Sequence, residues 1–196
     1  YYDAYNKYSE YIRSSPDSLK GYVARGYTQI FLKKVTEAIG DFDMAIKLDS
    51  MNYKGYAGKG AAYMMIMNSE DAARNYLRAI ELNPEDVVSM SSLSVILFSD
   101  GKTKEAFEMI GRAIDTDPSN AENYRGRAGM YFQKGDTASA FEDINKAIEL
   151  APMKDELYNF RGALYRESEK YDEAIADFNR ALGLNPNSAE AYCRRG

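Results

Sequence analysis

The amino-acid sequence predicts an all-α protein in which antiparallel helix pairs stack into an α-solenoid. Three observations carry this prediction: a 34-residue repeat without insertions, a stripe of aromatic and small residues at helical spacing, and a proline followed by a polar capping residue at the repeat ends. The repeat divides the 196 residues into a half repeat (1–18), five whole repeats (19–52, 53–86, 87–120, 121–154 and 155–188) and a partial repeat (189–196). We expect all of them to form a single repeat domain, residues 1–196.

The first half of each repeat is predicted to be an amphipathic helix. An aromatic residue, a small residue four positions later and a bulky residue three positions further on fall on one stripe of a helix. The small residue lets a neighbouring helix approach closely. The aromatic site holds Tyr22, Tyr56, Met90, Tyr124, Tyr158 and Tyr192, and the small site holds Gly26, Gly60, Ser94, Ala128, Gly162 and Gly196.

The second half of each repeat is predicted to be a helix that presents alanine to the first. We expect these alanines to be buried where the paired helices meet, so that a large side chain there would cost about 1 to 3 kcal/mol. They are Ala4, Ala38, Ala72, Ala106, Ala140 and Ala174 at one site, and Ala45, Ala79, Ala113, Ala147 and Ala181 seven positions later.

Most repeats end with signals that stop one helix and start the next. Proline cannot continue a helix because it lacks the backbone N–H, and Ser, Asn or Asp two residues later is a preferred N-cap. The prolines are Pro16, Pro84, Pro118, Pro152 and Pro186, and the caps are Ser18, Asn52, Asp86, Asn120 and Ser188. Ser50 and Lys154 depart from this pattern.

A charged pair recurs inside the repeats, with Arg on the first helix and Asp sixteen residues later on the second. The pairs are Arg25 with Asp41, Arg127 with Asp143, and Arg161 with Asp177, while Lys59 with Asn75 and Leu93 with Met109 hold the same two sites in the remaining repeats. Because the chemistry changes on both helices together, we interpret the Arg–Asp pairs as structural ion pairs within a hairpin and not as catalytic groups.

The composition excludes most enzyme chemistry. The chain has no His and a single Cys, Cys193, so it cannot form a Ser-His-Asp triad, a Cys-His dyad or a thiolate zinc site. The Gly-Lys-Thr at 101–103 lacks the glycine that a phosphate-binding loop needs five residues earlier, where Ile96 stands. We therefore predict a non-enzyme with no catalytic residues, metal or cofactor, and we interpret Cys193 as an ordinary thiol.

The period and the residue pattern resemble the tetratricopeptide repeat (TPR) family over the whole chain. The repeats supply the family's order of aromatic, small, aromatic, alanine, aromatic, alanine and proline in one register. Gln29, Tyr11 and Met90 are mild departures. The resemblance implies a right-handed superhelix whose inner wall comes from the first helices, and a noncatalytic scaffold that binds a peptide or helix of a partner protein.

Carried over by register, the resemblance places inner-wall residues on the first helices. Most are apolar in the first three whole repeats, and most are polar in the last two. Because an apolar concave patch usually marks a partner site, we expect a peptide to lie against the first three repeats, with polar contacts from the last two fixing its direction. The expected groove residues are Val23, Tyr27, Ile30, Phe31, Met64, Met65, Val95, Phe98, Arg125 and Asn159. Alternatively, Ile30, Phe31, Met64 and Met65 are buried between neighbouring repeats or under a missing segment.

Other functions stay open at this stage. The chain starts with Tyr1 and not Met, so we expect a piece of a longer protein, in which it could select substrates for an enzyme such as a glycosyltransferase. RNA binding is disfavoured by the net charge of -5. Binding of chaperone C-terminal tails is rejected because the Lys, Asn and Arg set that it needs is missing. In the first three whole repeats the corresponding sites hold Val23, Tyr27, Gly58, Val88 and Ser92.

The expected partner is therefore another protein or peptide, with no nucleic acid and no membrane insertion. The apolar stretch at 60–67 is far shorter than the ~20 residues that a bilayer span requires. We expect a soluble protein, in the cytoplasm rather than the periplasm. Self-association through the truncated repeat ends, near residues 1–11 and at Tyr192, is also expected because solenoids need polar caps.

Overall fold

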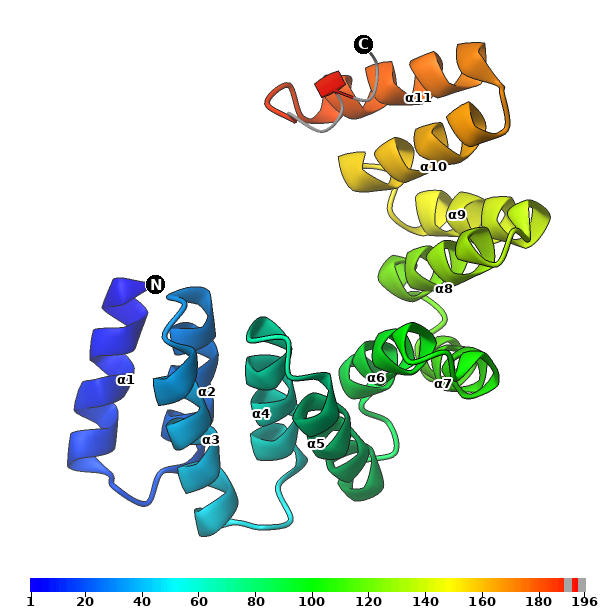
Figure 1. Cartoon of the computed structure of the whole chain (residues 1–196). Helices are drawn as coiled ribbons and strands as arrows, with labels where there is room; N and C mark the ends of the chain where they lie inside the picture. The colour runs from blue at the N-terminus through cyan, green and yellow to red at the C-terminus, as the bar shows by residue number, and fades with distance from the viewer. Residues whose placement is uncertain (189–191, 194–196) are drawn as a thin grey trace. The chain divides into compact units, whose positions relative to one another are not determined.

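The computed structural model describes residues 1–188 together with Tyr192 and Cys193. That part of the chain contains eleven α-helices and no strand, in the order that the 34-residue repeat predicts (Figure 1). The all-α prediction is thereby confirmed. Most of the partial repeat 189–196, with the small residue Gly196, lies outside the described residues.

The helices group into two compact units, and the first of them comprises residues 1–109. Within unit 1, each helix from α1 to α6 packs against the next one, and α4 also packs against α2 and α6. The first helices of successive repeats therefore adjoin. The helices are α1 (Tyr2–Ser14), α2 (Leu19–Phe31), α3 (Val35–Leu48), α4 (Tyr53–Met65), α5 (Ser69–Leu82), α6 (Val87–Ser99) and the beginning of α7 (Thr103–Thr116).

Unit 2 comprises residues 110–196. After the end of α7, two hairpins follow, in which α8 packs against α9 and α10 packs against α11, and α9 also contacts α10. The helices are α8 (Ala121–Gln133), α9 (Thr137–Leu150), α10 (Asp155–Glu167) and α11 (Tyr171–Leu184). That residues 1–196 act as one domain stays a prediction.

The alanines of the second helices lie in the core. From repeat 19–52 to repeat 155–188, none of these alanines at either site is more than 3 % exposed. The bulky residues between the two alanine sites, including Phe42, Ile144 and Phe178, are also fully buried. The helix pairs therefore approach each other through alanine while rings and branched side chains fill the remaining space.

Three of the five predicted N-caps make the expected hydrogen bond, Asp86 does not, and the cap at Ser188 stays a prediction. Ser18, Asn52 and Asn120 each accept a backbone N–H of the following helix at 3.1 Å. Asp86 precedes α6, but its side chain makes no capping hydrogen bond. The turns inside the hairpins share a positive φ at one repeat site, where Lys33, Met67, Gly101, Gly135 and Glu169 stand.

Candidate functional site

The first helices of unit 1, α2, α4 and α6, adjoin and carry the apolar part of the predicted groove. We call the side chains of Tyr27, Ile30, Phe31, Ala57, Ala61, Met64, Met65, Val95 and Phe98 the first-helix face. The central helix α4 is lined with small residues on its packed sides. A Cβ at Gly60 would lie 2.9 Å from the ring of Tyr76, and one at Gly58 would overlap the ring of Phe42. These small residues therefore let α4 pack closely against its neighbours.

The first-helix face exposes large apolar side chains to solvent. Phe31 is 62 % exposed, Met65 50 % and Val95 49 %. Tyr27, Ile30, Met64 and Phe98 are half-buried. One side of Phe31 is stacked on the ring of Tyr1, with centroids 4.8 Å apart and planes at 13°. The alternative that neighbouring repeats bury Ile30, Phe31, Met64 and Met65 therefore does not hold for Phe31 and Met65.

The structure buries two of the residues predicted to line the groove. Val23 is 8 % exposed and Asn159 is 2 % exposed. Helix α2 packs against α1, α3 and α4, which leaves the Val23 side of the helix covered. The Nδ2 atom of Asn159 donates to the hydroxyl of Ser188 at 3.5 Å, so the segment after α11 reaches this side chain. Helix stacking therefore removes both residues from the set that a partner could contact directly.

Arg125, the other predicted polar residue, is half-buried and already paired. Its Nε donates to Glu122 at 2.7 Å, and Glu122 also accepts from Lys154 at 2.9 Å. Burial raises the pKa of Glu122, but the hydrogen bonds from Lys154 and Arg125 outweigh burial and lower that pKa overall. Arg125, Glu122 and Lys154 thus form a small charged network in unit 2.

Sequence reasoning missed two exposed apolar residues that directly follow α4. Met67 is 91 % exposed and Ile66 53 %. Met67 also has a φ of 58°, at the turn site where Gly101 and Gly135 stand in later repeats. A non-glycine residue in this conformation carries a backbone cost of about 1 kcal/mol. The signal that could have found it is the apolar run at 60–67, which continues past the end of α4.

Tyr27, a member of the first-helix face, is partly buried and lies within electrostatic range of Asp86. The ring of Tyr27 packs edge-on against Phe42, with centroids 5.2 Å apart. Burial, followed by the negative charge of Asp86, raises the pKa of Tyr27 to about 12. Asp86 is 9 % exposed, and its Oδ2 atom has no hydrogen-bond partner in the structure. Tyr27 therefore stays a neutral hydrogen-bonding group at physiological pH.

The three Arg–Asp pairs have one geometry. Each Arg donates through Nε and Nη2 to the two carboxylate oxygens of its Asp at 2.7 to 2.8 Å. The pairs are Arg25 with Asp41, Arg127 with Asp143, and Arg161 with Asp177. In each case the hydrogen bond to Asp raises the pKa of the guanidinium. The carboxylates are buried and fully engaged, which suits a structural role and leaves no free group for catalysis.

The second whole repeat departs from the hairpin pairing. Lys59 does not pair with Asn75, because its Nζ atom donates to Asp43 on the preceding helix α3 at 2.6 Å. Asn75 donates instead to the backbone carbonyl of Asp71 at 2.8 Å. In the third whole repeat, Leu93 is 1 % exposed, as expected for the apolar replacement.

No group of three or more His, Cys, Asp or Glu side chains among the described residues could hold a metal ion. None of the described helices combines the length and the apolar composition needed to cross a bilayer.

Comparisons with known proteins agree with this architecture. The family model described as TPR repeat matches residues 162–196, and the one described as Tetratricopeptide repeat matches residues 97–154. No curated protein matches the chain.

Solved structures match nearly the whole chain. YrrB, described as a TPR protein with an unusual peptide-binding site, has a TM-score of 0.65 and 18% identity, with 95% of this chain and 96% of that chain covered. The APC/C hetero-tetramer Cut9-Hcn1 has a TM-score of 0.85 and 18% identity, over 98% of this chain and 38% of that chain.

A thermophilic TPR protein from Thermus thermophilus has a TM-score of 0.78 and 18% identity, with 91% of this chain and 97% of that chain covered. The fold therefore defines a helical-repeat solenoid protein. The two family-model matches identify tetratricopeptide repeats at residues 97–154 and 162–196, in agreement with the 34-residue period, and the solved structures share the fold.

Proposed function

We propose that this TPR chain is a noncatalytic scaffold that binds an apolar peptide or an amphipathic helix of a partner protein on the first-helix face of unit 1. TPR folds are generally scaffolds for protein–protein interaction, and YrrB is described as having a peptide-binding site. The observation that carries the proposal is the exposure of Phe31, Met65 and Val95 on three adjoining helices.

The physical argument rests on apolar area. A soluble protein gains free energy when such side chains leave water, at about 25 cal/mol per Å² of apolar surface. Methionine side chains adapt to irregular partner surfaces because they are unbranched and flexible. A face built on packed helices is also formed in advance, so that little conformational entropy of the scaffold is lost on binding.

The test starts from peptides selected on the chain. A random peptide library displayed on phage is selected against the chain, and selected peptides are titrated by fluorescence anisotropy. We expect apolar sequences whose affinity falls at least about tenfold in Phe31→Glu and in Met65→Glu, because each change places a charge in an apolar contact.

Matched controls are available on α11, outside the first-helix face. Tyr171 is 60 % exposed and Ile175 is 46 % exposed, close to the values of Phe31 and Met65. Tyr171→Glu and Ile175→Glu should leave the affinity unchanged. Equal affinity of Phe31→Glu, Met65→Glu and the original chain, with normal helical content, would refute the proposal.

A further inference from the structure

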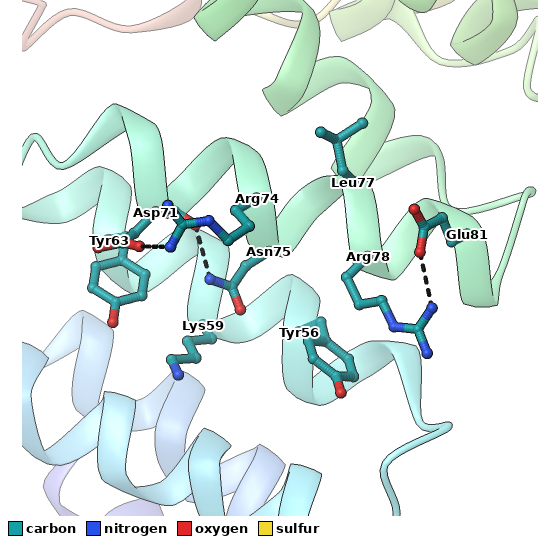
Figure 2. A pocket seen from close by; sticks show the side chains of 9 residues that line it. All are labelled: Tyr56, Lys59, Tyr63, Asp71, Arg74, Asn75, Leu77, Arg78 and Glu81. Carbon is teal, nitrogen blue, oxygen red and sulfur yellow. Dashed lines mark hydrogen bonds and ion pairs between the residues drawn. The ribbon is translucent and has the colours of Figure 1, made fainter.

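A second candidate site lies in a hollow of about 660 Å³ between α4 and α5. Its residues come from a side of α4 different from the one that carries Ala57 and Ala61 on the first-helix face, since helical positions advance by about 100° per residue. Figure 2 shows the polar ends of Lys59, Asn75 and Tyr56 on one side of the two helices. Arg74 and Arg78 extend from α5 beside them.

The hollow lies where three other repeats hold a buried carboxylate. In repeats 19–52, 121–154 and 155–188, an Asp on the second helix accepts two hydrogen bonds from the Arg of the first helix. Repeat 53–86 has Asn75 at the Asp site and Lys59 at the Arg site. The Nζ atom of Lys59 donates to Asp43 of α3, and the two α5 carboxylates of the lining, Asp71 and Glu81, pair with Arg74 and Arg78.

The same place in repeat 121–154 provides an internal comparison. There the hollow between α8 and α9 has a volume of about 360 Å³ and contains the Arg127–Asp143 pair. Its lining has two cationic and three anionic side chains, whereas the α4–α5 hollow is lined by three cationic and two anionic ones. Of these two repeats, the one that lacks the Asp has the larger hollow and the more positive lining, in a chain whose net charge is -5.

The cations of the α4–α5 hollow can exchange partners. Arg74 pairs with Glu70 and Asp71, and Arg78 pairs with Glu81, but the side chains of both arginines are more than 40 % exposed. Exposed pairs of this kind contribute only about 0 to 1 kcal/mol each. The Lys59 side chain is only 21 % exposed, so a second carboxylate beside it is less screened by water.

We propose that the α4–α5 hollow binds an acidic peptide segment, with a Glu or Asp side chain that takes the place held by Asp41, Asp143 and Asp177 in the other repeats. The carboxylate would accept hydrogen bonds from Lys59 and from the amide of Asn75. The exposed Arg74 and Arg78 provide the attraction for neighbouring acidic residues. This site is independent of the first-helix face.

The probe is a peptide of alternating Glu and Gly, titrated into the ¹⁵N-labelled chain at low ionic strength, with a Gln–Gly peptide as its control. We expect saturable shifts of the backbone amide signals of Lys59, Asn75 and Arg78 with the Glu–Gly peptide only. The shifts should weaken as salt is added, because the charges are close to the surface.

Two variants make the test specific. Asn75→Asp restores the carboxylate found in the other repeats, and it should reduce the affinity for the Glu–Gly peptide at least about tenfold while leaving the fold intact. Phe31→Glu should leave this affinity unchanged. An unchanged affinity of Asn75→Asp, equal binding of the Gln–Gly peptide, shifts that fall elsewhere, or no shifts at all would overturn the proposal.

Discussion

Gly58 provides a sharp test of how α4 packs in unit 1. A Cβ added at Gly58 would meet three atoms of the Phe42 ring at less than normal contact distance, and Phe42 is 0 % exposed. Gly→Ala in a helix interior normally stabilises by about 0.5 to 1 kcal/mol. Overpacking of a filled core costs about 1 to 3 kcal/mol. We therefore expect Gly58→Ala to lower the free energy of unfolding by up to about 2 kcal/mol, because the clash outweighs the helix propensity.

Gly40 on α3 is the matched control, because a Cβ there would meet nothing within 4 Å. Gly40→Ala should stabilise unit 1 by about 0.5 to 1 kcal/mol. Urea unfolding followed by far-UV circular dichroism measures both changes. Phe42→Leu combined with Gly58→Ala should show a coupling energy, since the smaller side chain relieves the clash. If Gly58→Ala stabilises as much as Gly40→Ala, the close approach of α4 to Phe42 is refuted.

Three further predictions follow from the charged and phenolic groups. Asp177→Asn should lower the free energy of unfolding of unit 2 by about 3 kcal/mol, because it leaves the partly buried Arg161 without its carboxylate partner. Adding Arg161→Met to this variant should recover part of the lost stability, because no unpaired charge then remains. In a spectrophotometric titration, Tyr27→Phe should remove one phenol that titrates near pH 12. Because folding raises the pKa of Tyr27, the contribution of Tyr27 to the free energy of unfolding is complete below pH ~10 and is lost as the pH rises through 12. Hydrogen bonds from Ser139 lower the pKa of Asp136. The contribution of the Asp136 carboxylate to the free energy of unfolding is therefore present above pH ~4 and is lost as the pH falls further. Urea unfolding should accordingly show a smaller difference between Asp136→Ala and the original chain in acid than at neutral pH.

The sequence predicts the parts of the structure that recur with the repeat. The alanine sites, including Ala38 and Ala140, are buried in successive second helices, because one packing solution is used in each hairpin. The Arg–Asp spacing of sixteen residues likewise reports a contact inside one hairpin, such as Arg25 with Asp41. Contacts of this kind are local, and a repeated pattern on both helices is enough to locate them.

The features that the sequence did not predict depend on contacts outside the paired helices of one hairpin. Lys59 pairs with Asp43 of the preceding repeat, and Asn159 is buried beside Ser188, which follows α11 at the end of the same repeat. The pattern of paired sites within a hairpin carries no information on these contacts. The exposure of Met67 was also missed, because its turn site holds Gly, Lys or Glu in the other repeats; only the apolar run at 60–67 indicates it.

The most direct test of the proposed function is hydrogen–deuterium exchange of the chain with and without a phage-selected peptide. Bound peptide should slow exchange in α2, α4 and α6, since these helices carry the exposed Phe31, Met65 and Val95. Protection should be absent from α11, where the control residues Tyr171 and Ile175 lie. Protection confined to unit 2, or unchanged exchange in α2, α4 and α6 at saturating peptide, would contradict a partner site on the first-helix face.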